Sequence, residues 1–197
     1  MANIVLTGDT SGTITVAAPA VAGTNTLTLP ANTGNIVTTG DSSTITQGMI
    51  GSNVAGTGPS FKATMSAVTA ISNSGATKLV LNTEEWDTNS NYDSATNYRF
   101  TPTVAGYYLI TGSMFMSTAT TARVGVAIYK NGSEHAWQFT AGVSSAGGAN
   151  PQVSTIVYAN GSTDYFELYA AQNYASSVNA SNNSVLTWFS GALVRSA

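Results

Sequence analysis

One stretch of the sequence, from Tyr98 to Met116, constrains the fold more than any other part of the chain. It opens with aromatic residues and Pro102, which has no N–H to donate to a sheet, and we expect it to turn at Gly106. The run that follows alternates with a period of two, which is typical of a β-strand. The two predicted strand faces are both apolar, with Tyr108, Ile110 and Met114 on one face and Tyr107, Leu109 and Phe115 on the other. Such a strand needs a burial partner on each side.

The composition favours an all-β protein that works in an assembly. Charged residues make up only 8% of the 197 residues, against a usual share of roughly a quarter. The surface is therefore hydrated mainly by Ser, Thr, Asn and Gly. The net charge is −3 and the six basic residues are scattered singly, so we expect no nucleic-acid partner.

Several classes of protein are not indicated by the sequence. It contains no Cys, so neither a disulfide framework nor a thiolate metal site is expected. The first residues do not read as a signal peptide, and no apolar run approaches the roughly 20 residues that span a bilayer. We therefore expect synthesis in the cytoplasm of a host cell and no membrane insertion.

Residues 1–57 differ from the rest of the chain, since they contain no aromatic residue and only two charged ones, Asp9 and Asp41. Short β-prone pieces alternate with turn sequences such as Gly-Asp-Thr-Ser-Gly. Too few large apolar residues are present to form a core, so the segment is either disordered or ordered on a partner, including copies of itself. We interpret it as an attachment arm. Its candidate contact residues are Ile4, Val5, Leu6, Ile14, Val16, Leu27 and Leu29.

The order of residues in this arm resembles a module found in bacteriophage fibre and virion structural proteins. The resemblance covers roughly residues 12–40, where Ala-Pro is followed by Ala-Gly-Thr-Asn-Thr-Leu-Thr-Leu-Pro, a second turn and Val-Thr-Thr. It implies a virion location. Residues 41–59 read as a linker that ends in a Gly-rich hinge.

Residues 58–197 read as a head domain of regularly spaced strands with no helical periodicity, which predicts an antiparallel jelly-roll β-sandwich. Asn131-Gly132 predicts a type I′ hairpin, and Asn160-Gly161 predicts a second hairpin. The predicted strands are Lys62–Val68, Lys78–Leu81, Tyr98–Pro102, Tyr107–Met116, Arg123–Tyr129, Glu134–Thr140, Val153–Tyr158, Tyr165–Ala170 and Val185–Val194.

The head domain resembles the globular head of complement component one, subcomponent q, a branch of the tumour-necrosis-factor-like jelly rolls. The motifs that carry the resemblance are, in order, Leu79–Asn82, Trp86-Asp87, Tyr92-Asp93, Phe100–Pro102, Ala105–Tyr108, Lys130–Gly132 and Phe189–Leu193. The family's pattern departs at Asn160–Asp164, where a longer turn is expected. The resemblance implies a tight homotrimer, which agrees with the doubly apolar strand. The alternative is an ordinary two-sheet core in a monomer. The candidate residues for the trimer interface or the core are Tyr107, Tyr108, Ile110, Phe115, Trp188 and Phe189.

Residues that could carry chemistry are few. His135 is the only histidine, and no nucleophile-elbow or phosphate-binding motif accompanies it. The densest acidic cluster is Glu84, Glu85, Asp87 and Asp93. The series Asp87, Asn89, Asn91 and Asp93 matches the start of a calcium loop but lacks the glycine and the closing glutamate that such a loop needs. We expect these residues to cap turns, no metal or other cofactor to be bound, and no enzymatic activity.

The leading hypothesis is a non-enzymatic homotrimeric virion structural protein on the particle surface. An arm followed directly by a head favours a capsid decoration or cement protein, whose partner is the major capsid protein or another virion protein. The alternative is the receptor-binding tip of a tail or head fibre, which would present the loops Gln172–Asn183 and Val143–Gln152 to a host-surface glycan or protein. A further alternative is a binding module of bacterial or host origin.

Overall fold

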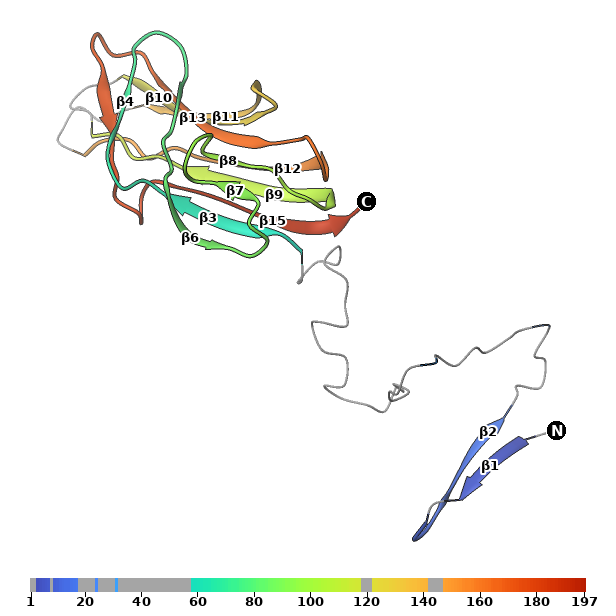
Figure 1. The fold of residues 1–197 in the computed structure, drawn as a ribbon. Helices are drawn as coiled ribbons and strands as arrows, with labels where there is room; N and C mark the ends of the chain where they lie inside the picture. The colour runs from blue at the N-terminus through green and yellow to red at the C-terminus, as the bar shows by residue number, and fades with distance from the viewer. Residues whose placement is uncertain are drawn as a thin grey trace. The chain divides into compact units, whose positions relative to one another are not determined.

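The structure, a computed structural model, describes residues 3–7, 9–17, 24, 31, 58–117, 122–141 and 147–197. The chain divides into two compact units, Met1–Thr44 and Ile45–Ala197. The predicted boundary between residues 57 and 58 stays a prediction, because residues 32–57 lie outside the described residues. Every helix or strand assigned within the described ranges is a β-strand, as the sequence predicted (Figure 1). No helix in these ranges is long and apolar enough to cross a membrane.

The N-terminal unit contains a β-hairpin of two antiparallel strands, β1 (Asn3–Thr7) and β2 (Thr13–Ala17). Gly12, just before β2, has a φ of +81°, a left-handed conformation that glycine adopts without strain. Both strands coincide with β-prone pieces predicted from the sequence. The other predicted pieces of the arm, including Leu27 and Leu29, lie outside the described residues.

The second unit is a jelly-roll sandwich of two antiparallel sheets. The five-stranded sheet has the order β12-β9-β15-β3-β6, and the six-stranded sheet has the order β11-β10-β13-β8-β7 with β5 also paired to β13. The strands of the five-stranded sheet are β3 (Ser60–Thr64), β6 (Thr83–Asp87), β9 (Ala105–Ser113), β12 (Gln152–Asn160) and β15 (Trp188–Ser196). The strands of the six-stranded sheet are β5 (Thr77–Lys78), β7 (Tyr92–Asp93), β8 (Arg99–Phe100), β10 (Arg123–Lys130), β11 (Ser133–Ala141) and β13 (Phe166–Gln172). Two short strands, β4 (Thr69–Ile71) and β14 (Val178–Ala180), pair with each other.

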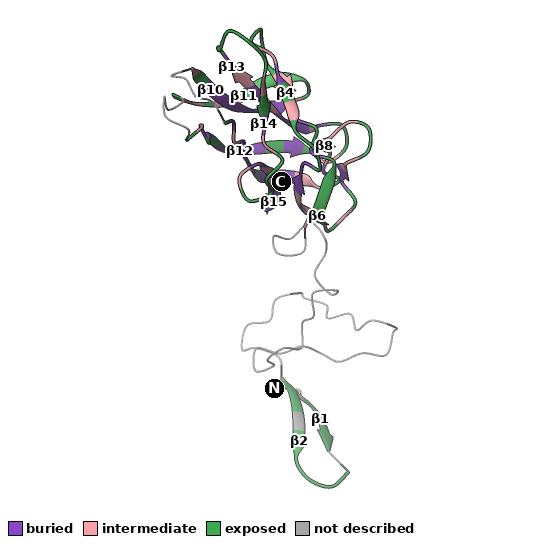
Figure 2. Cartoon of the chain, turned by 90° about the vertical axis from the view of Figure 1, so that its left-hand side faces the viewer, coloured by how far each residue is buried: buried purple, intermediate pink, exposed green. Residues whose placement is uncertain are grey.

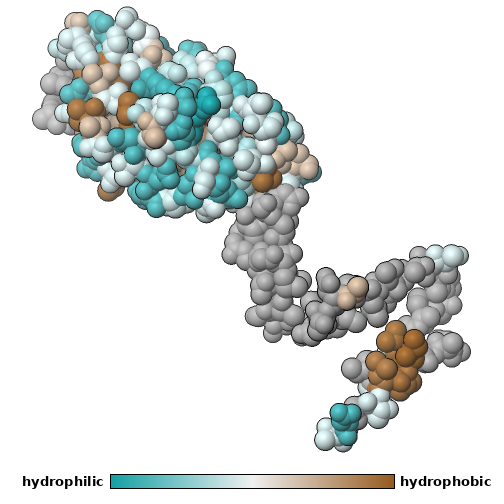
Figure 3. All heavy atoms as spheres, viewed as in Figure 1, coloured by the Kyte–Doolittle hydropathy of each residue, from teal (hydrophilic) through white to brown (hydrophobic). Residues whose placement is uncertain are grey.

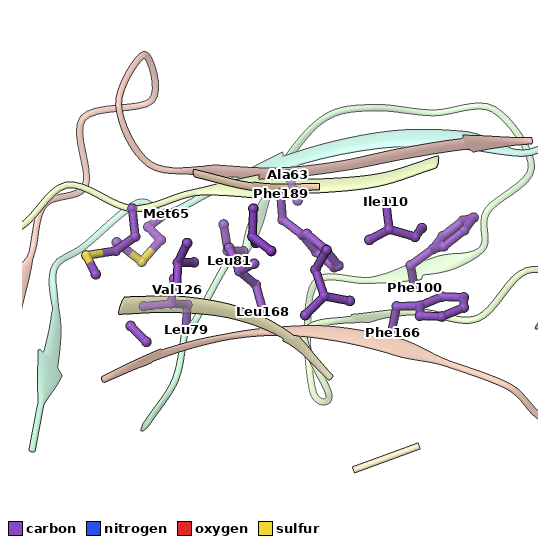
Figure 4. Close-up of a cluster of buried hydrophobic side chains, with 14 of the residues drawn as sticks. Ala63, Met65, Leu79, Leu81, Phe100, Ile110, Val126, Phe166, Leu168 and Phe189 are labelled. Carbon is purple, nitrogen blue, oxygen red and sulfur yellow. The ribbon is translucent and has the colours of Figure 1, made fainter. Parts of the chain in front are cut away.

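The core lies between the two sheets, where inward-facing side chains from both meet (Figure 4). Phe61 of β3 is its aromatic centre. Its ring stacks on Phe100 and Tyr92, with centroids 4.4 and 4.9 Å apart, and meets the edge of Phe189 at 5.0 Å. Rings at these distances and angles contribute beyond the area that they bury. The sandwich is therefore held by apolar packing that the alternating strands supply.

Strand β9 has the two faces that the sequence predicted. Tyr108, Ile110 and Met114 are fully buried in the core, whereas Tyr107 and Leu109 point outward and are partly exposed. The predicted turn at Gly106 is wrong, since this residue lies inside β9. A Cβ at Gly106 would lie 2.5 Å from the carbonyl oxygen of Arg195 on the neighbouring strand. Glycine therefore allows the close approach of β15 rather than a turn.

Some predicted boundaries and pairings are wrong. The strand predicted to begin at Val185 begins at Trp188, and the one predicted to reach Val68 ends at Thr64. Five short strands, β4, β5, β6, β7 and β14, were missed or only partly predicted, because two to five residues rich in polar side chains give no clear alternation.

The hairpin predicted at Asn131-Gly132 is confirmed, because both residues have the positive φ angles of a type I′ turn and join the paired strands β10 and β11. The hairpin predicted at Asn160-Gly161 is wrong, because β12 and β13 belong to different sheets. The Oδ1 atom of Asn160 instead accepts hydrogen bonds from the backbone N–H groups of Ser162, Thr163 and Asp164. The turn is a crossover between sheets.

Candidate functional site

The outer face of the five-stranded sheet carries four large apolar side chains on its two neighbouring strands β9 and β12. We call Tyr107, Leu109, Ile156 and Tyr158 the apolar sheet face. In the sheet register Tyr107 lies opposite Tyr158 and Leu109 lies opposite Ile156, so the four form one contiguous block. Their exposed fractions are 44%, 40%, 62% and 42% respectively. Ala192 of β15, on the other side of Leu109, adds only a small side chain.

The two tyrosines of this face are held in a defined geometry. Their rings meet edge to face with centroids 5.6 Å apart. Lys130 is the last residue of β10, and its Nζ donates a hydrogen bond of 2.8 Å to the backbone carbonyl of Tyr158. The same ammonium group lies 3.0 Å from the carboxylate of Asp164. One end of the apolar sheet face is therefore flanked by polar groups, as is common at the rim of a protein interface.

The sequence-derived candidate residues divide between the core and the surface. Tyr108, Ile110 and Phe189 are fully buried, which favours the core alternative for these three. Tyr107 lies on the apolar sheet face, and Phe115 and Trp188 are half-buried. Ile156 and Tyr158 were missed among the candidates. The alternation in their predicted strand was the signal that could have found them, because it gave that strand two apolar faces like those of β9.

The outer face of the six-stranded sheet carries a different arrangement, which we call the aromatic row: Arg123, Phe139, Trp137, Tyr129 and Tyr169. The Arg123 guanidinium lies 3.5 Å from the centroid of the Phe139 ring, and Phe139 stacks on Trp137 at 4.8 Å. Trp137 meets Tyr129 edge to face at 6.3 Å, and Tyr129 stacks on Tyr169 at 3.9 Å. The aromatic faces are thus largely occupied by one another.

A glycine beneath one ring and a carboxylate beside another hold the aromatic row in place. Gly125 lies beneath Phe139, and a Cβ there would come within 2.4 Å of the ring. The Tyr129 hydroxyl donates a hydrogen bond to Glu134 at 3.2 Å. Burial, and then the nearby Glu134 carboxylate, raise the pKa of Tyr129 to about 12. The tyrosine therefore stays neutral at physiological pH and acts as a hydrogen-bond donor.

Two of the four acidic residues singled out in the sequence, Asp87 and Asp93, cap turns, whereas Glu84 and Glu85 lie in strand β6 and Glu85 forms an ion pair with Lys62. Asp87 accepts hydrogen bonds from the backbone N–H of Asn89 and of Tyr92, the latter at 2.7 Å. Asp93 accepts from the N–H groups of Ala95, Thr96 and Asn97, and these bonds, led by that of Thr96, lower its pKa to about 2. The predicted role in turn capping is confirmed for both. Within the described residues no cluster of three or more His, Asp or Glu is arranged to hold a metal ion.

The single histidine lies on the surface. His135 is exposed on strand β11, two residues after the confirmed turn. The nearest acidic neighbour in the chain, Glu134, is bonded to Tyr129. The buried carboxylate of Glu167 forms an ion pair with Lys78. The contacts that the structure describes for Glu134 and Glu167 therefore serve to stabilise the fold.

No protein-family model matches the sequence, and no curated protein matches it either. The fold, in contrast, is similar to solved structures. The crystal structure of murine APRIL at pH 5.0 is similar with a TM-score of 0.56 at 10% identity, over 69% of this chain and 98% of that chain. The structure of Eiger TNF from S. frugiperda is similar with a TM-score of 0.55 at 7% identity, over 71% of this chain and 92% of that chain. The jelly roll is therefore of the tumour-necrosis-factor-like type, as predicted.

A weaker likeness is to the PRD1 vertex protein P5, with a TM-score of 0.49 at 16% identity over 70% of this chain and 72% of that one, a score at which a shared fold is not established. The finer resemblance of the head to the complement branch stays a prediction.

Proposed function

We propose that three copies of this chain associate through the apolar sheet face, and that the trimer is a non-enzymatic structural protein on the surface of a bacteriophage virion. The observation that carries the first part is the apolar sheet face itself. Contiguous apolar side chains of this size are uncommon on the surface of a monomer. Burying the exposed part of one such side chain contributes on the order of 1 kcal/mol.

A threefold arrangement suits the chemistry of this face. Tyr107 and Tyr158 combine a large apolar ring with a hydroxyl that stays hydrated or hydrogen-bonded, as interface residues often do. Three copies around an axis bring the same strands together without an open end, so the assembly closes. The resemblance to tumour-necrosis-factor-like heads, which associate as homotrimers, supports the same stoichiometry.

The virion location rests on the arm. Residues 12–40 resemble a module of phage fibre and virion proteins, and the N-terminal unit presents apolar side chains on a hairpin that has no core of its own. We propose that residues 1–57 attach the trimer to the particle. Within the virion we favour a capsid decoration or cement protein, because the sequence has no long shaft between the arm and the head. Apolar and main-chain contacts of such an arm would hold at any salt concentration.

The proposal includes no catalytic step. Among the described carboxylates, Asp87 and Asp93 are used in turn capping and Glu167 in an ion pair. His135 lies on an exposed strand. Trimer formation and attachment require only the apolar and main-chain surfaces described above.

The copy number of the chain in purified particles tests the proposal. We expect a number comparable to that of the major capsid protein, measured by quantitative mass spectrometry of intact virions. A few copies per particle would overturn the decoration role and favour a tail or fibre position. Finding no copies in the particle would overturn the virion location altogether.

The receptor-binding tip of a fibre remains the second candidate, and the aromatic row is the observation that favours it. The five side chains of the aromatic row contact one another on an outer sheet face and offer ring edges and flanking polar groups, a combination suited to binding a sugar or a protein. A low copy number, together with loss of host adsorption in a Trp137→Ala variant, would support this candidate over the decoration role.

A further inference from the structure

The N-terminal hairpin has one apolar face and one largely polar face. Ile4 and Leu6 alternate with Val5 along β1, and Val16 of β2 lies opposite Ile4 in the register. The hairpin apolar face therefore consists of Ile4, Leu6 and Val16, whose exposed fractions are 65%, 58% and 51%. The other face carries Val5 together with the exposed residues Thr7, Thr13 and Thr15. In Figure 3 the apolar side chains form a single brown cluster on the hairpin.

This hairpin lacks the features that protect an isolated sheet. Among the strands that the structure describes, its two strands are paired only with each other, so each has one edge without a described partner, and Figure 2 shows the hairpin exposed in its described parts. Neither strand contains a charged residue or a proline, and the register runs without a bulge. Natural proteins place such residues or bulges on edges that must stay unpaired. A two-stranded hairpin alone in water is also marginally stable at best. The unprotected strand edges and the marginal stability of an isolated hairpin both indicate that another surface packs against this one.

We propose that in the trimer the three hairpin apolar faces pack against one another and form a small second core. This inference rests on the trimer of the proposed function. It also divides the candidate attachment residues: Ile4, Leu6 and Val16 face the sister hairpins, while Val5 and the free strand edges remain for the particle.

Two arguments favour sister copies over a foreign protein as the occupant. The first is proximity. Forty residues, 18–57, separate the hairpin from the first described residue of the head, and a chain of that length spans at most roughly 140 Å when fully extended. Three hairpins on one trimer are therefore confined to a common volume, which makes their association intramolecular.

The second argument is the absence of charge. The two strands carry no ionisable side chain, and the charged Asp9 lies in the turn that joins them, so the hairpin apolar face itself does not select a partner by charge complementarity. Identical copies of an uncharged apolar face meet without the like-charge repulsion that self-association of a charged face would bring. Stacking three such faces leaves the threonines in water and removes the apolar side chains from it.

Single-cysteine variants of the full-length chain test the inference directly, because the protein has no native cysteine. The informative pair on β1 is Leu6→Cys and Val5→Cys, which are neighbours in the strand but lie on opposite faces. Val16→Cys and Thr15→Cys form the same pair on β2. Each variant is treated at low concentration with a bismaleimide of short spacer length, and the chains are separated on a denaturing gel. The mass in solution is measured by light scattering in parallel.

We expect a mass of three chains for every variant, with crosslinked pairs formed several-fold faster in Leu6→Cys and Val16→Cys than in Val5→Cys and Thr15→Cys. A trimer in which both faces crosslink at the same rate, or not at all, overturns the hairpin inference and leaves the trimer of the head standing. A monomeric mass overturns both. The hairpin and the head are separate compact units, so these substitutions do not threaten the folding of the head.

Discussion

Asp93 is a residue that the sequence predicted to cap a turn, and its hydrogen bonds confirm that role. Three backbone N–H groups and the Asn97 side chain all donate to its carboxylate. Because those donors favour the charged form, the pKa falls from 3.8 to about 2. Because the carboxylate already accepts four hydrogen bonds, few of its lone pairs are left to bind a metal ion.

This lowered pKa predicts a contribution to acid stability. Since the folded pKa lies below the unfolded value, the contribution is fully present above about pH 4 and is lost as the pH falls through 2. We expect Asp93→Asn to lower the free energy of unfolding at pH 7 by about 1 kcal/mol or less, after allowance for solvent screening, and to have a smaller effect at pH 2. Urea unfolding at both values measures this. The control is the exposed Glu84→Gln, and an equal loss at both pH values would contradict the prediction.

Phe61 is the residue at which the aromatic packing of the core converges. It is fully buried between three other rings. We expect Phe61→Ala to lower the free energy of unfolding by about 3–5 kcal/mol, because the cavity cannot collapse among rigid rings. Val68→Ala, at an exposed position, should stay within about 0.5 kcal/mol of the parent protein. A loss for Phe61→Ala as small as that of the control would contradict the packing described here.

At the scale of the element, one residue of the β10–β11 hairpin both shapes the turn and bonds to a segment far away in the chain. Asn131 adopts a φ of 54°, and its side chain also donates to Asp164 at 2.7 Å and accepts from the N–H of Tyr165 at 2.9 Å. The turn is thus tied to the crossover between the sheets. The type of turn was predictable from Asn-Gly, but the tie was not, because Asp164 and Tyr165 lie more than thirty residues away in the chain.

Two substitutions separate these functions. Asn131→Gly keeps the left-handed backbone and loses only the side-chain bonds, so we expect it to cost about 1–2 kcal/mol of unfolding free energy. Asn131→Ala also places a Cβ in the left-handed region and should cost about 1–2 kcal/mol more. Urea unfolding ranks the pair against Ser133→Ala, an exposed neighbour. Equal costs for Gly and Ala would show that backbone conformation is not limiting there.

At the scale of the whole molecule, the arrangement of two sheets leaves one apolar block facing outward. The sandwich buries the inner faces of β9 and β12 and leaves Tyr107, Leu109, Ile156 and Tyr158 on the opposite side. In a monomer the exposed parts of these side chains stay in water and contribute no burial to stability. Their placement on neighbouring strands makes them one surface, and it is this surface that the proposed trimer buries.

Ile156→Arg is therefore expected to release monomers, because three guanidinium groups would be buried without partners at the interface. Light scattering should report the mass of one chain, with an unchanged far-UV circular dichroism spectrum. The matched control is Val185→Arg, which replaces an apolar residue that is 79% exposed but lies outside the sheets. A trimer that survives Ile156→Arg, or that is lost in both variants, would contradict the assignment of this face.

The sequence by itself determined the β class, the two faces of β9, the position of the Asn131-Gly132 hairpin and the two strands of the N-terminal hairpin. These features depend on side-chain alternation and on the conformations that Asn and Gly adopt, and both are local. The Asn160-Gly161 turn signal, however, led to the wrong prediction that β12 and β13 form a hairpin, because Asn-Gly also occurs where the chain crosses between sheets.

Only the tertiary structure decided which strands are neighbours. Alternation assigns Leu109 and Ile156 to an outward face, but it does not show that the two lie opposite each other. That pairing joins residues far apart in the chain, and its register is set by how both sheets close over a shared core. The apolar sheet face is therefore a property of the fold, built from residues that the sequence could place on a strand face but not side by side.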